Sequence, residues 1–269
     1  NKIIAIKMTE PIRFTKMHGA GNDYIYVNTM AFPVRNPEEL AIRLSASHTG
    51  IGSDGLILIK PSEKADFEMD MYNADGTQSE MCGNGIRCVG KYVYDYGLTD
   101  KTSVSIETLA GIKYLEFTFG DEEKNGRKTV ELVRVNMGAP ILAPEDVPVD
   151  LPDAGDIVQD YPIMVAGKEY RITCVSMGNP HCVSFVDDVD NFPLEEVGPL
   201  FENNPIFPRR VNAEFVELVS PTYAKMRVWE RGTGETLACG TGTCATAVAC
   251  ILNGKTEDEV TVKLLGGEL

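Results

Sequence analysis

The sequence predicts an α+β protein of two pseudo-symmetric domains, each a curled, antiparallel-rich β-sheet around a central helix. Three observations predict it: an internal repeat at a fixed spacing, strands of alternating polarity before each repeated turn, and an apolar helical stripe after each turn. Strand-rich segments that each carry one buried helix are typical of sheets packed against a helix.

The internal repeat relates two cysteine-containing turns. Placing Cys82-Gly83-Asn84-Gly85 over Cys239-Gly240-Thr241-Gly242 defines an offset of 157 residues (239 − 82) without a gap. The same offset pairs further positions in polar segments, namely Asn22 with Asn179, Gly55 with Asn212 and Asn73 with Glu230. The chain therefore divides into two related halves, which we place at residues 1–125 and 126–269, with the boundary in an acidic, glycine-containing turn.

A strand is predicted just before each cysteine turn. Apolar and charged residues alternate there, which is typical of a strand with one buried face. The apolar positions are Phe67, Met69 and Met71 in the first half and Met226 and Val228 in the second.

A helix is predicted just after each turn, because apolar residues recur there at helical spacing. The stripe consists of Ile86, Val89, Gly90 and Val93 in the first half, and of Cys244, Ala245, Val248, Ala249 and Leu252 in the second. Asn253-Gly254 is a stop signal for the second helix.

Composition limits the classes of partner. A net charge of −15 and a pI near 4.7 argue against nucleic acid and anionic membranes, which require a basic face. No apolar run reaches the ~18 residues of a membrane span, so we expect a cytoplasmic protein. Seven cysteines without a Cys-x-x-Cys pair, and only three histidines, argue against a metal site and favour free thiols.

The paired cysteines suggest a particular chemistry. A cysteine at a helix N-terminus lies at the positive end of the helix dipole, which lowers the thiol pKa. Inverting an α-amino acid carbon without a cofactor needs a base on one face of the carbon and an acid on the other, and two cysteines can exchange these roles. Backbone N–H groups of the two turns would hold the substrate carboxylate. These belong to Gly83, Asn84, Gly240 and Thr241.

The residues closely resemble the diaminopimelate epimerase family, cofactor-independent enzymes that interconvert LL- and meso-diaminopimelate. The resemblance runs from Phe14 to Leu269. Its motifs are Lys16-Met17-His18-Gly19-Ala20-Gly21-Asn22-Asp23, Asn73-Ala74-Asp75-Gly76, Met81-Cys82-Gly83-Asn84-Gly85-Ile86-Arg87-Cys88, Gly178-Asn179-Pro180-His181 and Glu230-Arg231-Gly232-Thr233-Gly234-Glu235-Thr236.

The resemblance implies a role for each matching residue. Cys82 and Cys239 are the implied acid/base thiols, with His181 and Glu230 as polar neighbours that orient and tune them. The implied substrate-binding residues are Asn22, Asn73, Asn179, Asn212, Glu230 and Arg231. Asn73, Asn179, Asn212 and Arg231 would hold mainly the distal, non-reacting end. The family also implies no cofactor, no metal, a homodimer, and a place in lysine and peptidoglycan precursor biosynthesis.

Several alternatives stay open at the level of sequence. A proline or hydroxyproline racemase of the same fold uses a similar cysteine pair, although Cys82-Gly83-Asn84-Gly85 and Glu230-Arg231 favour diaminopimelate. A phenazine-biosynthesis-type isomerase shares the architecture without the two thiols. A non-catalytic redox or binding protein could use the two cysteines as a disulfide. Asparagines before turns, such as Asn73 and Asn179, also serve as turn formers.

The remaining cysteines and the end of the chain complete these expectations. Free buried cysteines usually act as small apolar side chains, and this is the role we expect for Cys88, Cys174, Cys244 and Cys250. By the same offset Leu265 falls on Thr108, so the second half ends where the first half begins a strand over residues 112–119. We therefore expect the second half to lack the final strands of the family pattern.

Overall fold

The computed structural model describes residues 11–124 and 126–269 and divides them into two compact units. Unit 1 holds residues 11–17, 23–81 and 88–131. Unit 2 holds residues 18–22, 82–87 and 132–269, so the turns that carry Asn22 and Cys82 belong to it. The predicted domain boundary, residue 125, lies outside the described residues.

In the part of the chain that the structure describes, the first sheet has eight strands in the order β1-β2-β3-β4-β6-β7-β8, with β5 paired to β4. The pairs β2–β3 and β4–β6 are parallel, whereas β3–β4 and β6–β7 are antiparallel. Its strands are β1 (Thr15–Gly19), β2 (Asn22–Asn28), β3 (Gly55–Lys60), β4 (Phe67–Asn73), β5 (Gln78–Ser79), β6 (Ser103–Thr108), β7 (Gly111–Lys124) and β8 (Arg127–Asn136). Its helices are α1 (Pro37–Ser45) and α2 (Gly83–Asp95).

The second sheet also has eight strands among the described residues, in the order β16-β15-β13-β12-β11-β10-β9, with β14 paired to β13. Here β11–β12 and β13–β15 are the parallel pairs. Its strands are β9 (Tyr161–Val165), β10 (Lys168–Ser176), β11 (Pro180–Phe185), β12 (Asn212–Ser220), β13 (Tyr223–Glu230), β14 (Gly234–Glu235), β15 (Thr261–Leu264) and β16 (Gly267–Glu268). Its helices are α3 (Leu194–Glu202) and α4 (Gly240–Leu252).

The predicted repeat is present in the elements themselves. Shifting α1 by 157 residues gives the bounds of α3, and the same shift takes α2 onto α4. The strand register follows as well, because Tyr24 pairs with Gly55 in the first sheet and His181 pairs with Asn212 in the second. The predicted fold class, α+β with two related sheets, is confirmed.

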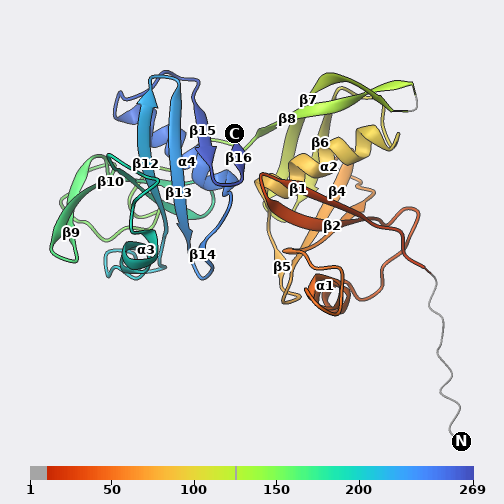
Figure 1. Ribbon diagram of the computed structural model, residues 1–269, viewed down its shortest axis with the longest axis horizontal. Coiled ribbons are helices and arrows are strands. Elements are labelled where there is room, and N and C mark those ends of the chain that lie inside the picture. Colours follow the sequence, from red (N-terminus) through yellow and green to blue (C-terminus); the bar gives the residue numbers. More distant parts are fainter. Residues whose placement is uncertain (1–10, 125) are drawn as a thin grey trace, which may run out of the picture. The chain divides into compact units, whose positions relative to one another are not determined.

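The second sheet is buried on both faces, which explains its nearly continuous apolar strands. One face packs on α3, where Phe215 is stacked on Phe192 with ring centroids 4.3 Å apart and meets Phe201 edge-on at 5.0 Å. The other face carries Val183, Val216 and their neighbours and packs on α4, seen beside β12 and β13 in Figure 1. Truncating a core phenylalanine of this kind costs about 3–5 kcal/mol.

The predicted elements around the cysteine turns are found, with one correction. β4 alternates as expected, with Phe67, Met69 and Met71 buried. Helix α4 ends at Leu252, before Gly254 with its φ of +63°. Its buried face is rotated from the predicted stripe, because Cys244 and Val248 are only half-buried. Small residues let the sheet approach the helix instead; the buried residues are Gly242, Thr243, Ala245, Thr246, Ala249 and Cys250.

Two further predictions concern the segment that connects the two halves, and the absence of a membrane-spanning helix. The long strands β7 and β8, which lie on either side of residue 125 in the sequence, are neighbours in the first sheet. Among the described residues, no helix is both long and apolar enough to cross a membrane.

Candidate active site

Each of the two predicted thiols caps the N-terminus of a thirteen-residue helix. Cys239 is the N-cap of α4, and its Sγ accepts a hydrogen bond from the backbone N–H of Gly242 at 3.3 Å. Cys82 directly precedes α2, and its Sγ accepts from the N–H of Gly85 at 3.4 Å. Because a sulfur in this place satisfies one of the orphan amides of the first turn, each cysteine is held at the positive end of its helix.

Polar side chains surround Cys82. Its Sγ donates to Oδ1 of Asn22 at 3.3 Å, and the same oxygen lies 3.4 Å from Nδ2 of Asn84. The amide of Asn84 also donates to the carbonyl of Ala238 at 3.3 Å, while its Oδ1 accepts from Arg87 at 2.6 Å. Asn84 therefore links the Cys82 turn to the residue that precedes Cys239.

The two cysteine turns meet at their glycines, within unit 2. A Cβ built on Gly83 would lie 3.5 Å from the Cα of Gly240, and one built on Gly240 would lie 3.3 Å from the Cα of Gly83. Arg87 comes within 3.9 Å of both built positions. A Cβ at Gly83 would make an ordinary contact and one at Gly240 a tight one, so the two helix N-termini lie close together. This approach brings the first-turn amides of α2 and α4 to one place.

The expected lowering of the thiol pKa is wrong for Cys239. Its side chain is buried, and burial together with the charges of Glu230 and Glu214 raises the pKa of the Cys239 thiol well above its usual value. Hydrogen bonds from Thr241 and from the Gly242 amide oppose this rise. The sequence argument considered only the helix N-terminus, and it could not include carboxylates brought in from β12 and β13.

A chain of polar contacts connects Cys239 with a buried histidine. The Oγ1 of Thr241 lies 3.5 Å from the Sγ of Cys239 and accepts from Nδ2 of Asn179 at 3.2 Å. The Oδ1 of Asn179 lies 3.0 Å from Nε2 of His181, whose Nδ1 lies 2.6 Å from Oε1 of Glu214. His181 thus reaches the sulfur through two intermediate side chains.

Glu214 is the residue of this site that sequence reasoning missed. It lies near the start of β12 with no exposed surface, and burial raises the pKa of its carboxyl group against the opposing effect of His181. A Cβ at Gly242 would come within 2.7 Å of its Oε1, so the carboxyl group lies directly beside the first turn of α4. The available signal was an acidic residue inside the apolar run Ala213-Glu214-Phe215-Val216.

Two of the residues predicted for the distal end of the substrate, Asn212 and Arg231, lie near the end of β13. The Asn212 amide donates to the carbonyl of Pro180 at 2.9 Å and accepts from the backbone N–H of Arg231 at 2.8 Å. The guanidinium of Arg231 donates to the carbonyl of Arg209 at 3.0 Å. Glu230, half-buried, accepts from the hydroxyl of Thr236.

Asn73 belongs to unit 1, whereas the other predicted site residues belong to unit 2. It ends β4 and closes its own turn. Its backbone N–H donates to the carbonyl of Thr77 at 2.8 Å, and its Nδ2 donates to the Thr77 hydroxyl at 3.0 Å. The turn-forming role considered for this asparagine is therefore present in the structure.

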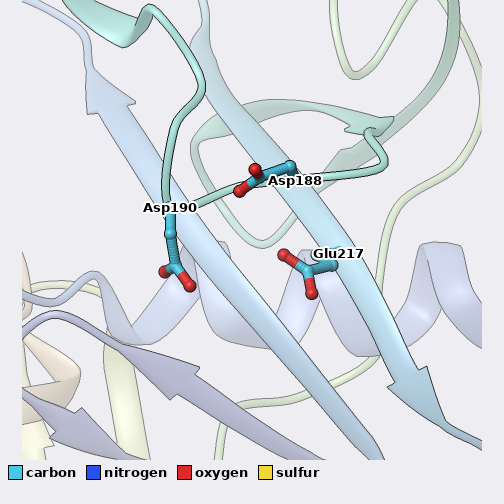
Figure 2. A group of neighbouring side chains, drawn as sticks. All are labelled: Asp188, Asp190 and Glu217. Atoms are coloured by element: carbon cyan, nitrogen blue, oxygen red, sulfur yellow. The ribbon is translucent and has the colours of Figure 1, made fainter.

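A group of three carboxylates on unit 2, shown in Figure 2, has the residue types of a cation site. Oxygens of Asp188, Asp190 and Glu217 lie within 4.8 Å of one another. Lys225 lies 2.7 Å from Asp190 and 3.7 Å from Glu217, and the amide groups of Asn191 donate to Asp188. These contacts offset part of the acidic charge and hold the loop after β11 against β12 and β13.

The model of the family described as diaminopimelate epimerase matches residues 14–143 and 173–269. The match includes both cysteine turns, the His181 segment and the strand that carries Glu214. The chain belongs to the diaminopimelate epimerase family.

Curated relatives agree over almost the whole chain. The diaminopimelate epimerase of Acetivibrio thermocellus is 59% identical over 258 residues, which is 96% of this chain and 89% of that protein. The protein of that name from Agathobacter rectalis is 59% identical over 263 residues, covering 96% of this chain and 90% of its own. The one from Methanococcus maripaludis is 55% identical over 258 residues, with shares of 96% and 90%. The prediction of an epimerase, an isomerase of this family, is confirmed.

Solved structures share the fold of this family member at low sequence identity. A probable proline racemase from Agrobacterium radiobacter aligns with a TM-score of 0.65 at 16% identity, covering 96% of this chain and 83% of that one. A phenazine biosynthesis protein from Bacillus anthracis aligns with a TM-score of 0.62 at 18% identity, covering 96% and 87%. At these identities the likeness shows the fold alone, so the racemase and phenazine alternatives are not favoured over the diaminopimelate epimerase family.

Proposed function

We propose that this protein interconverts LL- and meso-diaminopimelate without a cofactor, with Cys82 and Cys239 as the acid/base pair. The observation that carries the proposal is the matched placement of the two thiols. Each sulfur accepts the N–H of the residue three positions later, at the start of a helix, and the two helix starts meet at Gly83 and Gly240. Such an arrangement offers two proton-transfer groups beside one anion-binding place.

The reaction balances between the two sulfurs. The thiolate takes the α-proton, so the Cα–H bond breaks, an S–H bond forms, and the electron pair spreads into the substrate carboxylate. The opposite thiol then gives its proton to the other face of the carbon and becomes the thiolate. First-turn amides would hold the carboxylate, where they stabilise the growing negative charge. They belong to Gly83, Asn84, Gly240 and Thr241.

The environment of Cys239 suggests which of the two sulfurs is protonated before the substrate binds. Burial and the neighbouring carboxylates of Glu230 and Glu214 raise the pKa of the Cys239 thiol, which favours the protonated sulfur. In our proposal the substrate-free protein therefore carries Cys239 as the thiol. Cys82 acts as the base once the S–H hydrogen that it donates to Asn22 has left. Each turnover leaves the two sulfurs in exchanged protonation states.

Recognition of the whole substrate would involve both amino-acid ends. A doubly zwitterionic molecule needs amide or guanidinium donors for its carboxylates and acceptors for its ammonium groups. Arg231 and Asn179 are proposed donors to the distal end, with Asn73 and Asn212 as further contacts. Glu230 is a proposed acceptor for an ammonium group, and Asn22 completes the Cys82 side. We also propose a homodimer that works in the cytoplasm in lysine and peptidoglycan precursor biosynthesis.

Deuterium transfer tests the proposal. Reduced protein is incubated with LL-diaminopimelate in deuterated water, and deuterium at the α-carbon is followed by proton NMR together with inversion. We expect deuterium in the inverted product, and loss of inversion by at least about a hundredfold in Cys82→Ala and in Cys239→Ala. Cys250→Ala is the matched control, because this buried thiol lies on α4 about 16 Å along the helix from Cys239.

The two single variants should also differ in a telling way. Each keeps one sulfur, so slow exchange without inversion should occur from LL substrate with one variant and from meso substrate with the other. Inversion that survives in either variant would rule out the two-thiol mechanism. Exchange with proline or 4-hydroxyproline but not with diaminopimelate would overturn the proposed substrate.

A further inference from the structure

Glu214 is an acidic side chain held in an apolar part of the second sheet. Its strand neighbours are Val183 on β11 and Val228 on β13, both of the apolar cluster that contains Cys239. Its Oε1 lies 2.6 Å from Nδ1 of His181, and among the described residues its Oε2 has no hydrogen-bond partner. Burying a carboxyl group in this way is unfavourable unless it is neutralised or paired.

The contacts of His181 fix how many protons this pair holds. The Oδ1 of Asn179 can only accept, so Nε2 of His181 must carry a hydrogen and donate it. A second hydrogen must lie between Nδ1 and Glu214, because two bare acceptors would repel each other at 2.6 Å. The carboxyl and the imidazole therefore share two protons and carry no net charge together.

From His181 onward each hydrogen bond has the same direction. Nε2 of His181 donates to Asn179, and the amide nitrogen of Asn179 donates to Oγ1 of Thr241. With that oxygen accepting, the single hydroxyl hydrogen of Thr241 is left to donate to Sγ of Cys239, 3.5 Å away. A donor aimed at sulfur favours the thiolate, against the burial that favours the thiol.

We propose that Glu214 is a positioning residue for the reaction, which shares a proton with His181 and thereby fixes the direction of the hydrogen-bond chain that ends on the Cys239 sulfur. The inference rests on the proposed role of Cys239. Glu214 itself touches neither the substrate nor the sulfur in this scheme. The proton that it shares with His181 limits the negative charge by which Glu214 raises the pKa of the Cys239 thiol.

The first half supplies an internal comparison. At the position equivalent to Glu214 it has Ile57, and at the position equivalent to His181 it has Tyr24. Cys82 is bonded to Asn22 instead. Removing Glu214 should therefore affect Cys239 and leave Cys82 unchanged.

The other charged groups near Cys239 bear on any measurement of its pKa. The charge of Glu230 on β13 raises the pKa of the Cys239 thiol, and Arg87 lies beside the Gly240 turn. Both residues are kept in every variant below, and the charge of Glu230 also raises the pKa of the Glu214 carboxyl group.

The test is the pH dependence of alkylation by iodoacetamide, followed separately at Cys239 and Cys82 by peptide mass spectrometry. In Glu214→Met we expect Cys239 to react about tenfold more slowly at pH 8, because one hydrogen bond to a charged acceptor corresponds to about one pKa unit. Glu214→Gln can still donate to Nδ1, so we expect less than a threefold change. Glu217→Gln, on the same strand, is the matched control and should leave both thiols and the epimerase activity unchanged.

Three outcomes would overturn the proposal: an unchanged Cys239 profile in folded Glu214→Met, an equal slowing at both cysteines, or faster alkylation of Cys239. The last would mean that Glu214 acts as a negative charge beside the sulfur. Should Glu214→Met fail to fold, Thr241→Val breaks the last link of the chain and should slow Cys239 alkylation by a similar factor. Where both variants fold, the double variant should show no further slowing, and additive effects would contradict the chain.

The rate of alkylation depends on the thiolate fraction of each cysteine and not on turnover. The proposed function and the proposed role of Glu214 can therefore fail separately. Absence of epimerisation with the expected alkylation pattern would remove the proposed function and leave the role of Glu214 intact. Normal epimerisation with unchanged alkylation of Cys239 in the variants would leave the proposed function intact and remove the role of Glu214.

Discussion

Tyr24 and His181 occupy the same position in the two halves, each paired across a parallel ladder, Tyr24 with Gly55 and His181 with Asn212. One half thus places a phenol where the other places a fully buried imidazole. The backbone repeat is conserved through this position while the side chains differ. The two thiols consequently have different neighbours, which suits a reaction whose substrate presents two different faces to them.

Asn84→Ala should lower both stability and turnover. Asn84 is almost fully buried, and its amide bonds Asn22 and the Ala238 carbonyl while it accepts from Arg87. Removing it leaves the carbonyl without this donor, which costs about 1–3 kcal/mol, and frees Asn22 to turn away from the Cys82 thiol. We expect kcat to be at least about tenfold lower in steady-state kinetics, and the free energy of unfolding to be lower in urea unfolding of the same samples.

The control for that substitution is Asn203→Ala. This asparagine bonds the Pro199 carbonyl at the exposed end of α3, so its loss should leave kcat unchanged. Equal kcat for Asn84→Ala and the parent protein would contradict the role given to Asn84.

Gly242→Ala should inactivate the protein while leaving most of its stability. The new methyl group would lie 3.1 Å from the Cys239 sulfur and 2.7 Å from Oε1 of Glu214, and both groups are held by their own contacts. Because 1 Å of displacement at a reacting group can cost a hundredfold in rate, we expect kcat to fall by about that factor. Alanine is otherwise the better helix former, which limits the loss of stability.

Steady-state kinetics together with thermal unfolding would check this prediction. Gly120→Ala serves for comparison, since a Cβ there meets only the flexible side chain of Glu131. A Gly242→Ala protein with parental kcat would show that the sulfur tolerates movement.

The part of the site that sequence reasoning predicted is the part encoded by local pattern. Cys82 and Cys239 stand before glycine-rich turns at one offset, and helix starts and stops have local signals, so both helices and both thiols could be placed. Fold class followed from the same repeat, because alternation in β4 and the stripe of α2 are visible within a few residues.

The missed part depends on strands that are distant in sequence. Glu214 reads as a surface residue of a strand, and only the packing of Gly242 above it shows that it is buried. Asn212 could be named, but its bonds to Pro180 and Arg231 follow from the pairing of β11, β12 and β13. The pKa of Cys239 was misjudged for the same reason, since its carboxylate neighbours come from two different strands.

Glu202 braces the turn that carries Arg231. Its Oε1 accepts from Arg210 at 2.7 Å and from the backbone N–H of Gly232 at 2.8 Å, and its Oε2 accepts from Nε1 of Trp229 at 2.8 Å. Burial alone raises the pKa of Glu202, but these hydrogen bonds and the Arg210 charge outweigh it and hold the pKa below its usual value of 4.5. A carboxylate with a lowered folded-state pKa stabilises the fold fully above the unfolded pKa.

Glu202→Gln should therefore destabilise the protein by about 2 kcal/mol at pH 7, because one charged acceptor for three donors is replaced by a neutral amide. The gap to the parent protein should persist down to about pH 4.5 and close as the pH falls through the lower folded-state pKa. Loosening the Arg231 turn should raise KM severalfold with little change in kcat. Urea unfolding between pH 3.5 and 7 checks the first effect, with the exposed Glu196→Gln on α3 for comparison. A gap that widened toward low pH would mean that Glu202 is protonated in the folded protein, and that its contacts are not those of a carboxylate.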